Sequence, residues 1–470
     1  MIRTGGERLN SVRPAPDKGK SKKTPGGAPE TNEYYERVAR HFRSAKHVSI
    51  FATIVFLLAA IATSRSELTI ENLQYLMKFI SFTNTETSIT ATRITYPSSD
   101  RTRLELFIGD LCYLSPEGYA LYDSRGNTIM TENIKYAFPM LSTGSKYALC
   151  YDLGGTAFTV FNTFAKLSSG TVDYPITAAD ISDAGNFVVA SSTREYRTAV
   201  MLYDSDLKLL SRVLRENYLS DVTLKRDGSE VAVMTAGSVD GEFVTTIELI
   251  VPGHDSVRKS VNFSGLGYSI HYMDNAIAVV YDSGIILYDS DLTLIRAVKD
   301  MSLVMTDVSD RYLTCIDASG VIGNSYAVTV YDTKGQVKAT ADLDGKLIGA
   351  DHDESGEYIF LLAGNTVTRI NLENRRIGQV KADASGFDIV AMSPDSYLIA
   401  TSSYALTCTP DDFGEKYLDD SADTADTGDA EPVTPPVTPD TAATETTSLP
   451  ETGIPDDTDG QDTAETTPAT

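Results

Sequence analysis

One short phrase recurs along the middle of this 470-residue chain at a nearly constant interval, and this repeat restricts the fold more than any other feature. Each copy is an apolar run, often ending in Tyr, that is followed by Asp or Asn. The intervals between successive Asp or Asn residues are 39, 42, 85, 43 and 39 residues. The long interval is two periods, and its missing copy is the run TTIELIV, which ends at Val251 before a Pro252-Gly253 turn. The six copies are Tyr122-Asp123, Phe161-Asn162, Tyr203-Asp204, Tyr288-Asp289, Tyr331-Asp332 and Ile370-Asn371.

A second recurring phrase precedes the first and reads strand, turn, strand. Examples are DISDAGNFVVAS (180–191), DVSDRYLTCI (307–316) and DHDESGEYIFLL (351–362). Asp, Asn and Gly favour tight turns, and alternating apolar residues can face neighbouring sheets. Four such strands in about 40 residues form one propeller blade, and a single blade cannot bury both of its faces. The sequence therefore predicts an all-β propeller over residues 87–408.

The number of repeat units predicts the number of blades. Seven full units run from residue 102 to residue 380, and residues 381–408 supply only part of an eighth. The β-rich stretch SITATRITY (88–96) precedes the first unit, so we expect it to supply the missing strand and close the ring. Eight blades are favoured, with seven as the alternative. Closure removes exposed sheet edges, which explains the repeat without any reference to function.

The two ends differ from the middle in charge. Residues 1–47 carry 11 Lys or Arg against 5 Asp or Glu, whereas residues 409–470 carry 1 against 17. The stretch between them has a net charge of −15, which would repel phosphate backbones, so nucleic-acid binding by the main domain is not expected. Residues 1–30 lack apolar periodicity, the pattern from Asn32 to Lys46 is helical, and the tail cannot bury a core. We therefore predict a largely disordered basic arm and a disordered acidic tail rich in Thr and Pro.

Residues 48–64 form an uncharged apolar stretch at the lower length limit for a membrane-spanning helix. Basic residues crowd its N-terminal side, which predicts a single-pass cell-membrane protein with a cytoplasmic N-terminus and an extracellular C-terminus. A cleaved signal peptide is the alternative, because Ala60-Ile61-Ala62 resembles a cleavage site, but a leader of this length disfavours it. An amphipathic linker helix is expected over 65–86, with its apolar face formed by Ile70, Leu73, Leu76, Met77 and Ile80.

Three features together carry a resemblance to a known family: the apolar stretch 48–64, the helix ENLQYLMKFI, and the phrase YALCYDLGGTAFTVFNTF (147–164). The chain resembles a Firmicutes family known as domain of unknown function 5711 over about residues 48–408. The resemblance implies a membrane-anchored exterior propeller of a Gram-positive bacterium, and it brings no catalytic residues. More distantly, SPDS (393–396) and the repeated Tyr-Asp phrases are similar to quinoprotein-like and YVTN-like β-propellers.

The sequence carries no motif of metal, redox or nucleophilic chemistry. Four cysteines lack CxxC spacing and are interpreted as buried thiols, with a Cys112–Cys150 bond left open. The histidines after the apolar stretch are far apart, and neither HExxH nor GxSxG occurs. The run Asp351-His352-Asp353-Glu354 is interpreted as an ordinary turn. We therefore predict no catalytic, cofactor-binding or metal-binding residues and no cofactor. The residues concerned are Cys112, Cys150, Cys315, Cys408, His254, His271 and His352.

The tail contains SLPETG (448–453), which matches a sortase sorting signal. A working signal needs an apolar stretch and a basic end after it, whereas the following residues are polar and acidic. The match is therefore interpreted as a coincidence or a relic, and the apolar stretch 48–64 is expected to hold the protein in the membrane.

The leading hypothesis for function is a non-catalytic binding or scaffolding module at the cell envelope, because propellers present broad loop-lined faces. Its expected partners are the membrane and an envelope protein or glycan. A carboxylate-dependent hydrolase or lyase is one alternative, since propeller enzymes draw carboxylates from different blades. A transmembrane sensor of an envelope signal is another. The sequence fixes neither the ligand-binding residues nor the oligomeric state.

Overall fold

The computed structural model describes residues 46–56, 92–254, 256–318 and 324–418. The chain divides into two units, Met1–Thr83 and Asn84–Thr470. The first unit contributes a helical segment at residues 46–56 whose large apolar side chains are exposed. No helix in the described ranges is both long and apolar enough to cross a membrane. Part of the predicted span (57–64) and the predicted linker helix (65–86) lie outside these ranges, so both stay predictions.

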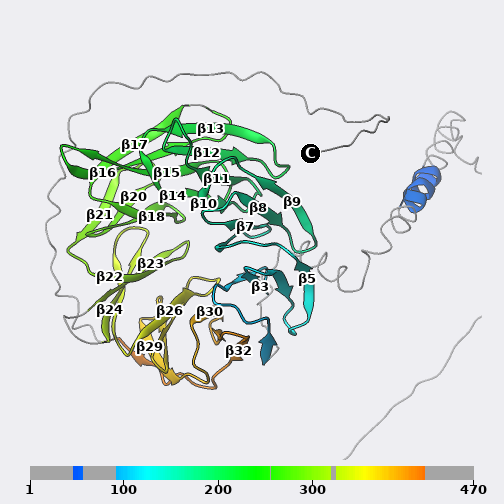
Figure 1. Cartoon of the computed structure of the whole chain (residues 1–470). Helices are drawn as coiled ribbons and strands as arrows, with labels where there is room; N and C mark the ends of the chain where they lie inside the picture. The colour runs from blue at the N-terminus through cyan, green and yellow to red at the C-terminus, as the bar shows by residue number, and fades with distance from the viewer. Residues whose placement is uncertain (1–45, 57–91, 255, 319–323, 419–470) are drawn as a thin grey trace, which may run out of the picture. The chain divides into compact units, whose positions relative to one another are not determined.

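The second unit is an eight-bladed β-propeller, as the repeat count predicts (Figure 1). Each blade is an antiparallel sheet in which neighbouring strands follow one another along the chain, except where the chain ends are used. Blade 1 consists of β2 (Arg103–Phe107), β3 (Asp110–Ser115), β4 (Gly118–Tyr122) and β5 (Thr128–Glu132), and blade 2 of β6 (Pro139–Thr143), β7 (Ala148–Asp152), β8 (Ala157–Phe161) and β9 (Lys166–Thr171). Blade 3 consists of β10 (Ile176–Ile181), β11 (Phe187–Ser191), β12 (Thr198–Tyr203) and β13 (Leu209–Arg215), and blade 4 of β14 (Tyr218–Leu224), β15 (Val231–Val239), β16 (Glu242–Ile250) and β17 (Val257–Ser264).

Blades 5 to 8 follow the same plan, with additional strands from the two ends of the domain. Blade 5 consists of β18 (Gly267–Tyr272), β19 (Ala276–Tyr281), β20 (Gly284–Asp289) and β21 (Leu294–Lys299), and blade 6 of β22 (Leu303–Val308), β23 (Tyr312–Ala318), β24 (Ser325–Asp332) and β25 (Val337–Asp344). Blade 7 consists of β26 (Leu347–His352), β27 (Tyr358–Ala363), β28 (Thr366–Asn371), β29 (Arg376–Lys381) and β33 (Lys416–Tyr417), and blade 8 of β30 (Asp388–Ser393), β31 (Ser396–Ala400), β32 (Tyr404–Cys408) and β1 (Arg93–Thr95).

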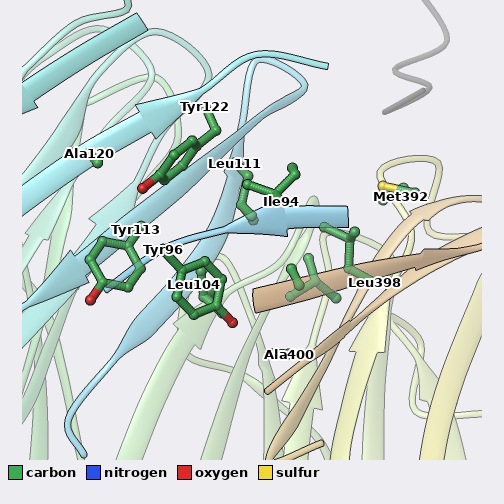
Figure 2. Packing of buried hydrophobic residues seen from close by; sticks show 12 residues of the cluster. Ile94, Tyr96, Leu104, Leu111, Tyr113, Ala120, Tyr122, Met392, Leu398 and Ala400 are labelled. Carbon is green, nitrogen blue, oxygen red and sulfur yellow. The ribbon is translucent and has the colours of Figure 1, made fainter. Parts of the chain in front are cut away.

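Strand β1 closes the ring. It pairs antiparallel with β32 and forms the outer strand of blade 8, next to β32 in Figure 1, with Ile94 opposite Ala405. The Ile94 side chain is fully buried in a cluster that includes Leu104 and Leu111 of blade 1 and Leu398 of blade 8 (Figure 2). The expected pairing of residues 88–96 with the last blade is therefore confirmed for the described part of that stretch.

The first repeated phrase is the turn between the third and fourth strands of a blade. The Asp123 side chain accepts hydrogen bonds from the backbone N–H groups of Arg125 (2.8 Å) and Asn127 (2.7 Å). Asp289 and Asp332 repeat this arrangement two and four residues downstream in their own turns. Asp side chains stabilise such turns because they bond backbone groups that have left the sheet. The repeated phrase therefore marks a turn, and it gives no evidence of a ligand site.

Buried side chains fill the spaces between blades. All four cysteines are buried free thiols, and Cys112 and Cys150 share one core cluster without a bond between them. Burial raises the pKa of the Cys315 and Cys408 thiols to about 12, so neither forms a reactive thiolate at neutral pH. These residues act as small apolar groups in the core, as the sequence predicts.

The ordered body continues past the boundary predicted at Cys408. Residues 409–418, here called the C-terminal strap, run along blade 7 and end in β33, which pairs with the outer strand β29. Phe413 and Tyr417 are the only aromatic residues after Cys408, and Phe413 is buried in the core cluster of blades 7 and 8. Burial of this one ring stabilises the strap despite the acidic composition around it. Residues 419–470, with the sortase-like motif, lie outside the described ranges.

Candidate functional site

The first strand of each blade lies innermost, against the first strands of neighbouring blades (Figure 1). Six of the eight inner strands carry a partly exposed carboxylate, and these six side chains come from six different blades. This set, here called the inner carboxylates, consists of Glu105, Asp180, Asp221, Asp307, Asp351 and Asp388. Their sequence separations of about one or two blades explain why no local motif reveals the set.

Most inner carboxylates bind the next blade. Asp180 accepts a hydrogen bond from the backbone N–H of Leu224 at 2.8 Å, which joins blade 3 to blade 4. Asp351 accepts one from Ala391 at 2.8 Å, which joins blade 7 to blade 8. Asp221 and Asp307 make the same type of bond, to Ile270 (3.0 Å) and His352 (3.1 Å), and Glu105 accepts one from the Thr143 hydroxyl (2.9 Å). These carboxylates therefore hold inner strands together.

The charge on this set is reduced by its surroundings. Burial, followed by weaker repulsion from Asp180 and Asp388, raises the pKa of Glu105 to about 7. Burial also raises the pKa of Asp388 to about 6. For Asp351, burial and then the neighbouring Asp307 hold the pKa well above its usual range. Burial is the main cause because a low-dielectric environment disfavours the charged form of a carboxyl group. Part of the set is therefore protonated near neutral pH.

One member takes part in a hydroxyl, imidazole and carboxylate relay. Thr314 Oγ1 lies 3.2 Å from His352 Nε2, and His352 Nδ1 lies 2.5 Å from Asp307 Oδ2. This order of groups activates the nucleophile in many hydrolases. Here the Thr314 hydroxyl belongs to a residue with no exposed surface, so a substrate has no access to it. The relay links blades 6 and 7 through their cores.

The acidic run at the end of β26 does not converge on one point. Asp351 bonds blade 8, His352 bonds Asp307 of blade 6, and Asp353 accepts a hydrogen bond from Tyr358 N (2.8 Å) within its own turn. Among the residues that the structure describes, no group of three or more His, Cys, Asp or Glu side chains is placed to hold a metal ion. His254 lies in a loop of blade 4, whereas His271 is on an inner strand of blade 5.

Two polar pockets lie at the end of the propeller that carries the turns between first and second strands and between third and fourth strands. We call this end the turn face. The pocket between blades 4 and 5 has a volume of about 340 Å³. One of its walls is an ion-pair network in which Arg258 binds Glu230, Asp291 (2.6 Å) and Ser290 O (2.6 Å). The pocket between blades 2 and 3 measures about 390 Å³ and is lined by Ser, Asn, Asp, Leu and Tyr side chains.

The opposite end carries the hairpins between second and third strands and the links between blades. We call it the linker face. Three exposed aromatic side chains lie at this end of blades 4 and 5, namely Tyr218, Phe243 and Tyr268, with exposed fractions of 60%, 58% and 56%. We call these three residues the aromatic patch. Tyr218 begins β14, Tyr268 is the second residue of β18, and Phe243 lies near the tip of the long β15–β16 hairpin.

Backbone contacts hold Phe243 and Tyr268 of the patch near each other. The N–H of Gly265, in the link between the blades, donates to the carbonyl of Phe243 (2.9 Å). The Thr245 hydroxyl donates to Gly265 O and accepts from Gly267 N, both at 2.8 Å. A Cβ on Gly267 would lie 2.6 Å from Met234 Sδ, so a glycine permits this close approach of the two blades. Tyr268 is thereby fixed beside the end of blade 4.

The surroundings of the patch are mainly acidic. Arg197 lies over the Tyr218 ring, with its guanidinium carbon 4.5 Å from the ring centroid. Four exposed acidic residues occupy the adjoining loops and strand ends, namely Glu216, Asp240, Glu242 and Asp282. Exposed aromatic rings with a polar rim are typical of binding surfaces. Sequence reasoning missed this patch because Tyr218 and Tyr268 do not differ locally from the many tyrosines that are buried between blades.

The model of the family of unknown function DUF5711 matches residues 81–406, and no curated protein matches the chain. BamB from Moraxella catarrhalis is 10% identical with a TM-score of 0.47, over 68% of this chain and 99% of BamB. The β-propeller domain of Myceliophteria thermophila Cps50 (Swd1) is 12% identical with a TM-score of 0.43, over 62% and 99% of the two chains. Hydrazine synthase from Kuenenia stuttgartiensis is 12% identical with a TM-score of 0.41, over 71% and 99%.

Proposed function

The chain belongs to the DUF5711 family of unknown function, and we propose that it is a membrane-anchored binding module whose propeller recognises an envelope partner through the aromatic patch. The observation that carries this proposal is the group of three aromatic side chains, each more than half exposed, on blades 4 and 5. Exposed Tyr and Phe side chains supply large contact areas at a small entropic cost, and such residues dominate binding energies.

The charge of the patch indicates the chemistry of the partner. Its acidic rim and the net charge of the propeller disfavour anionic polymers and favour cationic or uncharged surfaces. The rings can accept apolar side chains, and the acidic residues can bind Lys or Arg. The partner that fits best is therefore a segment of an envelope protein with basic and apolar residues, with a neutral glycan as the alternative.

The anchor and the exterior placement rest on the first unit. Residues 48–64 are uncharged, and the helical segment at 46–56 exposes Val48, Phe51 and Phe56. Exposed apolar side chains on a helix favour contact with lipid. The basic residues before this stretch favour a cytoplasmic N-terminus and a propeller outside the cell.

The patch is tested with a double variant of the whole chain. Tyr218→Ser with Tyr268→Ser should reduce retention of envelope proteins on the immobilised chain at least tenfold, because each lost aromatic anchor costs about 1 to 3 kcal/mol of binding. The melting temperature should not change, since both side chains are exposed. The matched control is Leu294→Ser with Val337→Ser, which removes exposed apolar residues from the turn-face end of blades 5 and 6. Equal retention by the two double variants would contradict the proposal.

The predicted topology is tested in intact cells. Protease added outside should remove an epitope placed after Thr470 and should spare one placed before Met1, because the positive flank holds the N-terminus inside. Permeabilised cells, in which both epitopes should be cleaved, provide the control. The opposite pattern in intact cells would reject the exterior placement.

A second candidate function, the carboxylate-dependent hydrolase or lyase, is favoured by one observation. Glu105 and Asp388 have pKa values raised to about 7 and about 6, and a carboxyl group that is protonated near neutral pH can act as a general acid. The capture experiment separates the two functions when released products are followed by mass spectrometry. Turnover that is abolished by Glu105→Gln and unaffected by the patch variant would favour the enzyme.

A further inference from the structure

We infer that the groove beneath the C-terminal strap is a peptide-recognition site, which the chain fills with its own residues 409–418 and which accepts in exchange an acidic peptide with a Phe two residues before a Glu. The strap shows which ligand chemistry this groove takes. The site is separate from the aromatic patch, since it lies on the outer edge of blade 7.

The groove has a deep aromatic pocket. Phe413 is 2% exposed, and its ring lies 6.1 Å from that of Phe360 and 6.3 Å from that of Tyr397. The guanidinium carbon of Arg369 lies 3.9 Å from the Phe413 ring centroid. Such a ring, packed against aromatic groups and a cation, is a typical anchor of a bound peptide.

A buried arginine, Arg369, binds the acidic residue Glu415 of the strap. The Arg369 side chain is 8% exposed and donates to Glu415 Oε1 at 2.6 Å. It also donates to Asp395 Oδ1 at 2.7 Å, which connects the groove to blade 8, and its buried Nε atom has no partner. Arg376 lies 3.7 Å from the other Glu415 oxygen. Without the strap, Arg369 keeps Asp395 but loses the second of its two carboxylate partners, so the groove favours a ligand with an acidic residue at this position.

The backbone contacts are those of an added strand. Gln379 N donates to Phe413 O at 2.8 Å, and Leu418 N donates to Arg375 O at 2.9 Å. A Cβ on Gly378 would lie 2.7 Å from the Cβ of Phe413, so only a glycine permits Phe413 to approach the strand this closely. Addition of a strand to a sheet edge, with side-chain pockets for specificity, is a common mode of peptide recognition.

The strap is attached in a way that permits exchange. Strand β33 forms only two residue pairs with β29, so side chains rather than a long ladder hold it. Blade 7 is the only blade with a fifth strand among the described residues. A strap tethered to the propeller competes at a high effective concentration, so a ligand peptide must displace it and binds more weakly than to an empty groove.

The test uses the full chain and a fluorescent peptide of residues 409–418. Phe413→Ala in the chain should free the groove, and peptide binding measured by anisotropy should then be at least tenfold tighter than to the wild type, whose groove is filled. The same peptide with Ala in place of Phe413 should bind at least tenfold more weakly. Adding Gly378→Val to the Phe413→Ala chain should abolish binding, whereas adding Val337→Thr, at an exposed position of the outer strand of blade 6, should not.

The inference is overturned if the Phe413→Ala chain keeps its circular dichroism spectrum but does not bind the peptide, or if Gly378→Val has no effect. If Phe413→Ala prevents folding, a protease site inserted within residues 409–412 of the wild-type chain replaces it. After cleavage of the folded protein, excess peptide should displace the severed tail, and a tail that no excess releases would also overturn the inference. Dimers that form with increasing concentration and dissociate when the peptide is added would support the inference. They would identify a second copy of the chain as one source of the ligand segment.

Discussion

Replacement of Ile94 by Asp is expected to unfold the propeller in one cooperative transition. Ile94 is the buried residue of β1, and its side chain has no exposed surface. It packs in the cluster that joins the first and last blades (Figure 2). Truncation of a buried Ile costs about 2 to 5 kcal/mol, and a buried carboxylate adds several more, which together approach the whole stability of a domain. Deletion of residues 88–96 should have the same result, since it leaves blade 8 without its outer strand.

Urea unfolding of the purified chain, followed by circular dichroism, provides the measurement. Thr95→Ala is the matched control, because Thr95 lies next to Ile94 on the same strand but is exposed, so its replacement should change the free energy of unfolding by less than about 0.5 kcal/mol. An Ile94→Asp chain that keeps the wild-type unfolding midpoint would show that ring closure does not depend on β1.

The free energy of unfolding is expected to fall as the pH rises from about 5 to 8. The pKa of Glu105 is about 7 in the folded protein, compared with an ordinary value of 4.5. The folded state therefore binds more protons than the unfolded state between these two values, and stability decreases with pH in that window. One pKa unit corresponds to 1.36 kcal/mol, so Glu105 alone should account for a loss of about 3 kcal/mol. Asp388, with a pKa raised to about 6, adds to the loss at the acidic end of the window.

Glu105→Gln should remove the share of this dependence that comes from Glu105. The variant keeps a hydrogen-bond acceptor for Thr143 and cannot ionise, so it should be more stable than the wild type at pH 8 and no more stable at pH 5. Glu117→Gln, at an exposed turn of the same blade, is the control and should leave the profile unchanged. A wild-type stability that is constant from pH 5 to pH 8 would show that the inner carboxylates remain ionised throughout.

The sequence alone determined the blades, because blades are built from local patterns. Alternating apolar residues define strands, and Asp123, Asp204 and their equivalents define the turns through bonds to backbone groups within four residues. The regular interval between these turns gave the blade count, and the stretch before the first unit identified the closing strand. The membrane anchor is a local signal of the same kind, and it stays a prediction.

Contacts between blades were decided only by the tertiary structure. Asp180 meets Leu224, and Thr314 meets His352, across 44 and 38 residues, and no local pattern encodes such pairs. The exposure of a side chain is also a property of the assembled ring. Tyr218 is exposed to solvent and Tyr281 is buried, although both are tyrosines on β-strands. The order of the strap could not be predicted from the sequence either, because an acidic segment with few apolar residues predicts disorder. One ring, Phe413, overcomes that composition only because blades 7 and 8 together form a pocket of its shape, and a pocket built from two blades does not exist in a linear chain.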